Sequence, residues 1–373
     1  MKLNTINEAI EDLKNNKVII VVDDENRENE GDFIYPAEII SPEIVNFMAT
    51  HGRGLICVPL TSKRCKHLKL DPMVSKNTEL MQTAFTISVD LIGKGVTSGI
   101  SASDRSKTIN SLVNENTKAS DLARPGHIFP LSAKDGGVLR RTGHTEAAVD
   151  LSRLAGYKPA GVLCEIMNKD GTMARLPDLF KVAKKFDLKI ISIEDLVSYR
   201  MKNDSLIDLI DEFKLKTIYG DFNLNTFKQK NNDQIHLALS KGSWLKDEAV
   251  LCRVNSFGSI NNSIDDLVIN ENQTIKKITK KINKEGKGVI VFVNQDFESK
   301  PILNNINHLK KIQRTGKDFK PFKKMDVKDF GIGAQILHKL NVSKIKLLTT
   351  KDRKIKRVGM AGYGLKITET VNF

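Results

Sequence analysis

VIIVVDDENRENEGD, residues 18–32, joins an apolar run to a dense cluster of carboxylates. The run Val18 to Val22 predicts a buried strand. Six of the next ten residues are Asp or Glu, so like charges crowd together where the strand ends. Such a cluster needs a cation to hold it, and hard oxygen ligands of this kind suit Mg²⁺. Arg27 lies within the cluster and can clamp an anion. The alternative is a solvated polar turn.

The composition is that of a soluble globular protein, with 40% hydrophobic and 28% charged residues in 373. This length predicts two domains, each able to bury its own core. We expect no membrane span and no secretory segment, because no apolar run is long enough for the first and the N-terminus shows no pattern for the second. The four cysteines are scattered, which favours reduced thiols in the cytoplasm over disulfides or a zinc cage.

The net charge of +14 is unevenly distributed, and nearly all of the excess lies after residue 200. A basic half can attract an anionic partner. No nucleic-acid motif and no aromatic stacking platform accompanies it. We therefore do not expect a nucleic-acid partner.

Strands that alternate with helices predict an α/β or mixed-sheet first domain. In this domain we expect strands at 18–22, 55–58 and 161–167, and helices at 6–13, 105–113, 178–186 and 194–201. After Arg200 the composition changes, which predicts a second domain. There we expect a short charged helix at 204–213, strands at 287–293 and 345–349, a helix at 329–340, and a loop-rich segment at 294–324.

A second polar cluster, residues 140–146, combines two arginines, two threonines, a glycine and a histidine. The guanidinium and hydroxyl groups suit phosphate oxygens, and Gly143 permits a tight backbone. His144 can ligate a metal or move a proton. The alternative is a structural histidine.

Three further segments contain candidate functional groups. His127 stands between prolines in 124–130, which suits a general acid or base; the alternative is a turn whose histidine caps a carbonyl. Glu165 interrupts the apolar run 161–167, which suits a partly desolvated carboxylate that transfers protons; the alternative is a strand-edge carboxylate facing water. The hydroxyl-rich segment 97–105 can bind an anion or serve as an ordinary helix cap.

Four of these motifs occur in an order that resembles 3,4-dihydroxy-2-butanone-4-phosphate synthase of riboflavin biosynthesis. They are DDENRENEGD (23–32), RPGHIFPL (124–131), GGVLRRTGHTEAAVDL (136–151) and AGVLCEIMNKDGTMARLPDL (160–179). The resemblance covers about residues 1–200. It implies a mixed-sheet α+β domain that converts ribulose 5-phosphate to 3,4-dihydroxy-2-butanone 4-phosphate and formate, with Mg²⁺ or Mn²⁺. It also implies a cytoplasmic homodimer whose active sites lie near the subunit interface, and an acidic loop that closes over the substrate.

The resemblance also implies roles for individual residues. Glu28 and His144 would be the metal ligands, and His127 and Glu165 would be essential for catalysis. The residues implied in substrate binding are Arg27, Glu28, Asp32, Arg141, Thr142, Gly143, His144, Thr145 and Glu165.

The second half resembles GTP cyclohydrolase II, in the segments YGDF (219–222), HLAL (236–239), DFGIGAQIL (329–337) and LLTT (347–350). We therefore expect a synthase domain over 1–203 and an α/β GTP cyclohydrolase II-like domain over 204–373. The zinc of that family needs three cysteines in one compact segment, and the corresponding residues 254–266 contain none. This predicts no zinc, no GTP hydrolysis and a structural or regulatory role. The alternatives are a bifunctional enzyme that also opens GTP and a non-catalytic anion-binding scaffold.

Overall fold

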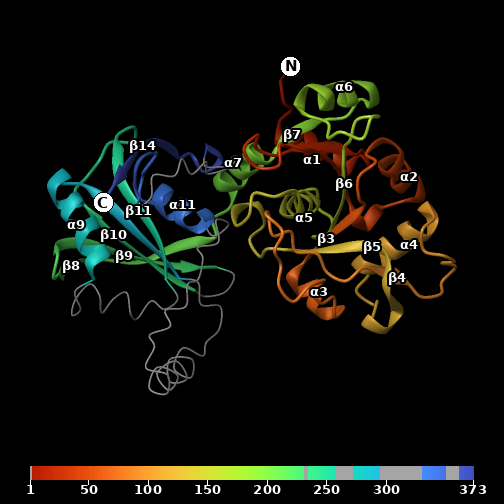
Figure 1. Ribbon diagram of the computed structural model, residues 1–373, viewed down its shortest axis with the longest axis horizontal. Helices are drawn as coiled ribbons and strands as arrows, with labels where there is room; N and C mark the ends of the chain where they lie inside the picture. The colour runs from red at the N-terminus through yellow and green to blue at the C-terminus, as the bar shows by residue number, and fades with distance from the viewer. Residues whose placement is uncertain (1, 231–233, 258–271, 295–329, 350–360) are drawn as a thin grey trace. The chain divides into compact units, whose positions relative to one another are not determined.

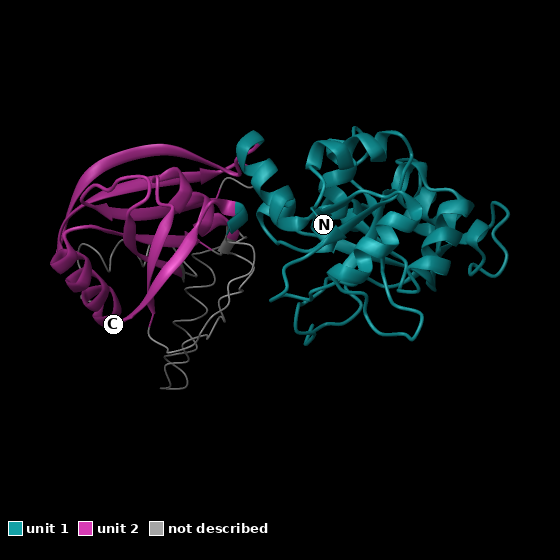
Figure 2. Cartoon of the chain, turned by 90° about the horizontal axis from the view of Figure 1, so that it is seen from above, with its two compact units in different colours: residues 1–203, 356–362 teal, residues 204–355, 363–373 magenta. Residues whose placement is uncertain are grey.

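The computed structural model describes residues 2–230, 234–257, 272–294, 330–349 and 361–373 (Figure 1). The chain forms two compact units, of which the first includes residues up to 203 and the second begins at residue 204 (Figure 2). Each unit is built on a seven-stranded sheet with both parallel and antiparallel pairs. The predicted fold class, two mixed-sheet α/β domains, is confirmed.

The sheet of the first unit has the strand order β4-β5-β3-β6-β2-β1-β7. Its strands are β1 Ile19–Val22, β2 Gly31–Pro36, β3 Cys57–Thr61, β4 Val89–Leu91, β5 Leu122–Ala133, β6 Gly161–Glu165 and β7 Ile190–Ser192. The helices are α1 Ile6–Lys14, α2 Pro42–His51, α3 Ser62–His67, α4 Ala102–Val113, α5 His144–Leu154, α6 Leu176–Phe186 and α7 Ile193–Asn203. Helix α1 begins with a complete capping box at Thr5 and Glu8.

Helices cover both faces of this sheet. Helices α1, α5 and α7 contact one another, and α5 lies across β1, β2, β6 and β3. On the other face, α2, α4 and α6 share one hydrophobic core with the strands. Every residue of β1 and β2 is therefore buried, which explains the uninterrupted apolar run at the start of the chain.

The strand register determines which polar residues meet on the α5 face. Phe33 and Cys164 belong to the core on the α2 side. Successive side chains of a strand point to opposite faces, so the neighbours Asp32 and Glu165 point toward α5. These two carboxylates are direct partners across β2 and β6, and Asp32 is also paired with Val21 of β1. Two acids far apart in sequence thus lie side by side.

The sheet of the second unit has the order β14-β13-β11-β12-β10-β9-β8. Its strands are β8 Ile207–Thr217, β9 Gly220–Gln229, β10 Ile235–Lys241, β11 Ala249–Phe257, β12 Gly288–Asn294, β13 Lys344–Thr349 and β14 Lys366–Asn372. Its described helices are α9 Gln273–Glu285 and α11 Phe330–Lys339. The core between α9 and the sheet contains Ile275, Ile278 and Ile282 on one helical stripe.

The structure corrects two predictions of local structure. The helix expected at 204–213 is wrong, because this segment forms most of β8. It pairs with β9 down to Thr217 and Gly220, where Gly220 has φ +113°, so hairpin pairing overrides the local composition. The strand expected at 55–58 begins only at Cys57. Residues 124–130 belong to β5, which excludes the alternative of a turn around His127.

The loop-rich segment expected at 294–324 lies outside the described residues from 295 onward. Within the described ranges, every helix is too short or too polar to cross a membrane.

Candidate functional site

The acidic loop, residues 23–30, connects β1 to β2 and is folded around Asp23. The Asp23 carboxylate accepts the backbone N–H groups of Glu28 at 3.1 Å and Glu30 at 2.9 Å. It also pairs with Nη1 of Arg27 at 2.9 Å, and the same nitrogen lies 2.5 Å from Glu28 Oε2. The side chains of Asp23 and Arg27 are 1% and 9% exposed. The loop is therefore no solvated turn, and Arg27 supplies one of the positive charges that the cluster needs.

His144 is the first residue of α5 and faces the acidic loop. Its Nε2 lies 3.1 Å from the carbonyl oxygen of Val21, and because a carbonyl only accepts, Nε2 carries the hydrogen. Nδ1 lies 3.7 Å from Glu28 Oε2 and 3.9 Å from Asp32 Oδ2, so it faces these carboxylates as a donor when the ring is charged and offers its lone pair to a cation when the ring is neutral. Metal-binding histidines are oriented by such a bond to the other ring nitrogen.

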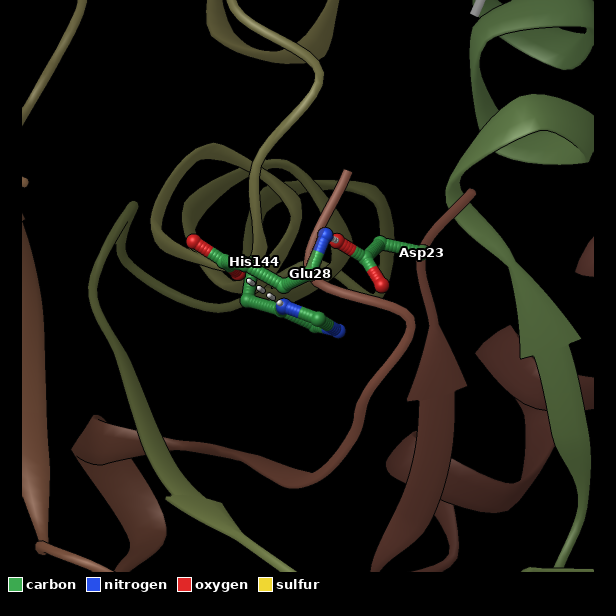
Figure 3. A group of neighbouring side chains, drawn as sticks. All are labelled: Asp23, Glu28 and His144. Atoms are coloured by element: carbon green, nitrogen blue, oxygen red, sulfur yellow. Dashed lines mark hydrogen bonds and ion pairs between the residues drawn. The ribbon is translucent and has the colours of Figure 1, made fainter. Parts of the chain in front are cut away.

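Ligand atoms of Asp23, Glu28 and His144 all lie within 4.8 Å of one another (Figure 3). The structure thus brings together the two residues expected to bind a metal, and adds Asp23 to them. The carboxylate oxygens, which outnumber the single imidazole, suit Mg²⁺ or Mn²⁺.

Asp32 lies beside this group and is fully enclosed. Among the described residues, no group donates a hydrogen bond to its Oδ1. Burial raises the pKa of Asp32 to about 8, with the charges of Glu165 and Glu28 adding to the effect and His144 opposing it. Buried polar atoms without a partner are rare in folded proteins. The unsatisfied oxygen therefore fits a site that is completed by a cation or by a ligand hydroxyl.

The charges of the site are strongly coupled. Burial acts to raise the pKa of Glu28, but the nearby imidazole of His144 and the charge of Arg27 outweigh it and hold the pKa at about 2. Burial acts to lower the pKa of His144, but Asp32 and Glu28 raise it to about 9. Without a metal, His144 therefore holds a proton among the carboxylates. A divalent cation would take the place of that proton.

Glu165 is held by the backbone of a neighbouring segment. Its Oε2 accepts the N–H of Leu55 at 2.8 Å. A Cβ on Gly54 would lie only 2.5 Å from the same oxygen, so a glycine is required there. Glu165 is half-buried, and its carboxylate is oriented toward the α5 face next to Asp32. Sequence reasoning missed Gly54, since a glycine carries no polar signal.

His127 is not brought to the metal ligands within one chain. It lies on β5, and β3 and β6 separate β5 from β2, so three strand spacings of about 4.8 Å place it roughly 14 Å from Asp32. Asp90, which sequence reasoning missed, holds His127 by two contacts. Its Oδ2 lies 2.7 Å from Nδ1 of His127 and its Oδ1 accepts the backbone N–H at 2.9 Å. The imidazole is 44% exposed.

The segment before α5 is built around a second buried ion pair. Arg141 donates from Nη1 to Glu146 Oε2 at 2.8 Å and from Nη2 to the carbonyl of Met81 at 3.2 Å. A Cβ on Gly143 would lie 2.5 Å from Nη1 of Arg141, so the glycine lets this pair form. No side chain caps the N-terminus of α5, whose N–H groups are free to face an anion. Thr145 is buried in the first turn and Thr142 is half-buried before it.

The hydroxyl-rich segment before α4 serves as an ordinary helix cap. Ser101 accepts the N–H of Asp104 at 3.0 Å. The Asp104 carboxylate accepts the N–H groups of Thr97 and Gly99. These contacts account for Thr97, Ser101 and Asp104, and we assign no ligand to this segment.

Comparison with known proteins matches both halves of the chain. The family model for 3,4-dihydroxy-2-butanone 4-phosphate synthase matches residues 7–199, and the one for GTP cyclohydrolase II matches residues 208–372. A Cytophaga hutchinsonii protein called riboflavin biosynthesis protein RibBA is 53% identical over all of this chain and 92% of its own length. A Bacillus mycoides protein of the same name is 48% identical over 98% of this chain and 92% of its own.

Two solved structures are also similar. RibBX, described as a two domain 3,4-dihydroxy-2-butanone 4-phosphate synthase from A. baumannii, is 37% identical, covers 99% of both chains and has a TM-score of 0.67. A 3,4-dihydroxy-2-butanone 4-phosphate synthase in complex with two magnesium ions is 40% identical, covers 54% of this chain and 98% of its own, and has a TM-score of 0.52.

These matches confirm both resemblances and correct one expectation. The GTP cyclohydrolase II family spans nearly all of the second unit, and full-length relatives are named RibBA. The prediction that the second domain is only structural or regulatory, with no cyclohydrolase activity, is therefore wrong. The expected absence of zinc concerned residues 254–266, most of which lie outside the described residues.

Replacing Glu28 with Gln should lower the affinity for Mn²⁺ at least about 100-fold, because the change removes a charged ligand whereas changes behind a ligand already cost 10–100-fold. Glu25→Gln removes the same charge from an exposed position of the same loop and should change the affinity little. Titration with Mn²⁺, monitored by electron paramagnetic resonance, measures the affinity of both variants. Equal losses in the two variants would contradict the proposed ligand.

Proposed function

We propose that residues 1–203 convert ribulose 5-phosphate to 3,4-dihydroxy-2-butanone 4-phosphate and formate. The chain belongs to the family of 3,4-dihydroxy-2-butanone 4-phosphate synthases that carry a GTP cyclohydrolase II domain. This reaction would serve riboflavin biosynthesis in the cytoplasm. The observation that carries the proposal is the meeting of Glu28 and Asp32 at Nδ1 of His144, with Oδ1 of Asp32 left unsatisfied among the described residues.

The cation is the first element of the proposed mechanism. Glu28 and His144 would hold Mg²⁺ or Mn²⁺, as the donor set favours and as a similar synthase solved with magnesium suggests. When bound, the cation polarises the substrate ketone and the adjacent hydroxyl. Asp23 fixes the loop from which Glu28 reaches the site.

Proton transfer is the task of the carboxylates on the α5 face. The reaction begins with removal of a proton beside the ketone, and Asp32 and Glu165 lie side by side where the substrate carbons would be held. Glu165 is fixed by the Leu55 N–H, so its free oxygen can receive a proton without reorienting. The later dehydration, rearrangement and loss of formate need further proton transfers at the same place.

The phosphate of the substrate would bind at the start of α5. The uncapped N–H groups after Gly143, the hydroxyls of Thr142 and Thr145, and the charge of Arg141 converge there. Arg27 adds a positive charge from the acidic loop. Binding energy from this remote group would orient the reacting carbons.

We also propose that the enzyme is a homodimer. Asp90 orients His127 as a catalytic histidine would be oriented, yet two strands separate it from the metal ligands of its own chain. A second copy that presents its His127 to this site would complete the catalytic set. Closed two-fold dimers are the commonest arrangement for such pairing.

For the second unit we propose GTP as the ligand. The family match over residues 208–372 supports this, as do the full-length relatives. Because residues 254–266 contain no cysteine, any metal held there must use oxygen or nitrogen ligands.

Purified protein given ribulose 5-phosphate and Mg²⁺ should release formate, and a chelator should stop the release. Glu165→Gln should lower kcat by about 10²–10⁴-fold, as expected for a positioned acid–base group. Glu38→Gln is the matched control, since Glu38 also accepts a backbone N–H, that of Lys158, away from the site. No formate with either Mg²⁺ or Mn²⁺ would favour the non-catalytic scaffold.

Co-expression of differently tagged His127→Ala and Glu28→Gln chains tests the shared site. Each variant alone should be inactive. Random pairing makes about half of the dimers mixed, and each mixed dimer has one intact site, so about one quarter of the wild-type activity should return. No recovery in the isolated mixed dimer would show that His127 does not act across an interface.

Incubating the full chain with GTP, followed by chromatography and by calorimetric titration, tests the second unit. We expect saturable binding or consumption of GTP at millimolar nucleotide. ATP at the same concentration is the control for binding to basic surface alone. Equal responses to both nucleotides, or none to GTP, would contradict the assignment.

A further inference from the structure

Arg175 contacts the acidic loop from outside the site described above. It is the N-cap residue of α6, 147 residues after Glu28. Its Nη1 donates to the carbonyl oxygen of Glu28 at 2.9 Å and also to that of Asn29. Hydrogen bonds from a charged guanidinium are stronger than those between neutral groups. One side chain thus binds the carbonyl oxygens of two consecutive residues, one of which is the proposed metal ligand Glu28.

The backbone that Arg175 binds, at Glu28 and Asn29, includes an unfavourable conformation. Asn29 has φ +55°, in the left-handed region that residues other than glycine adopt at a cost. Asp23 holds the inner side of the loop through the N–H groups of Glu28 and Glu30. Arg175 takes the carbonyls that point the other way, so the two residues hold opposite sides of the same turn.

Packing does not hold the outer side of the loop. A cavity of about 690 Å³ lies against it, lined among others by Asn26, Glu30, Arg175 and Glu194. Of the three residues grouped around the proposed metal site, Asp23 lines this cavity and Glu28 and His144 do not. A loop that borders open space is kept in place by its hydrogen bonds.

The backbone of Arg175 is fixed at the start of α6. Its carbonyl accepts the N–H groups of Asp178 and Leu179 in the first turn of α6. Leu179 packs against Gly31, where a Cβ would lie 2.4 Å from Leu179 Cδ1. The start of α6 is therefore fitted to the first residue of β2, directly after the loop. The Arg175 guanidinium therefore connects the start of α6 to the acidic loop through hydrogen bonds.

We propose that Arg175 is a positioning residue that holds the backbone at Glu28 and Asn29 so that the Glu28 carboxylate faces His144. Its effect on the loop stands without any assumption about the reaction. Its effect on turnover rests on the proposed function.

The test compares Arg175→Met and Arg175→Lys with Arg64→Met in the full-length protein. Arg64 is a matched control because it also donates to backbone carbonyls, those of Leu112 and Asn114 at the end of α4, far along the chain from the loop. Amide hydrogen exchange of residues 23–30 and Mn²⁺ affinity are measured for each variant, together with formate release at low and saturating Mn²⁺.

We expect Arg175→Met to speed exchange in residues 23–30 and to lower Mn²⁺ affinity by about 10–100-fold, the range for groups that orient a metal ligand. Saturating Mn²⁺ should restore most of the formate release. Arg175→Lys should give intermediate values, because an ammonium keeps the charge and can donate to both carbonyls, but it is more strongly hydrated and ends a flexible stem. Arg64→Met should leave the loop and Mn²⁺ affinity unchanged.

The proposal is overturned if both Arg175 variants show the wild-type rate of amide exchange in residues 23–30 and the wild-type affinity for Mn²⁺. If Arg175→Met fails to fold, the Arg175→Lys measurements decide alone. A wild-type protein that releases no formate, with a loop that still loosens in Arg175→Met, would refute the proposed function and keep the positioning role.

Discussion

Burial of acidic groups at one end of the first sheet is the constraint around which this unit is organised. Among the described residues, the cationic side chains paired with Asp23, Asp32 and the partly buried Glu28 are Arg27 and His144. An uncompensated buried charge costs several kcal/mol, so these partners cannot be separated without loss of structure. Arg27 comes from the same loop, but His144 comes from α5, more than a hundred residues later. The helix must therefore dock with its first residue at the ends of β1 and β2.

Much of this arrangement is visible in the sequence because it uses side chains with distinctive chemistry. The apolar run before the acidic cluster and the capping box at Thr5 predict their local structure, whereas helix α5, which begins at His144, was not expected. The meeting of Glu28 with His144 was expected from the family resemblance and not from spacing. Spacing alone does not say which segments a sheet brings together.

The groups that sequence reasoning missed act through the backbone or through absence of a side chain. The Val21 carbonyl sets the tautomer of His144, and Gly54 makes room for Glu165. Asp90 lies in a short strand with no motif around it, and only the fold reveals that it holds His127. The helix wrongly expected at 204–213 failed for a related reason. Its strand conformation comes from pairing with β9 and not from its own residues.

The second unit shows why one missing motif is weak grounds for denying an activity. The absence of cysteines in residues 254–266 excludes thiolate ligands from that segment. It says nothing about the remaining residues, and the family match covers 208–372. Family membership is carried by a pattern spread over the whole sheet.

Strand β8 also bears on how the protein behaves at high concentration. In the described part of the second unit it is an edge strand of the sheet, and it exposes Leu209, Ile210 and Phe213. A long sheet edge with apolar side chains is a template for aggregation. Asp208, Asp211 and Glu212 carry negative charge along the same strand, with Lys214 and Lys216 close behind. These charges oppose edge-to-edge pairing between chains, so a strand of irregular, polar composition keeps the open edge soluble.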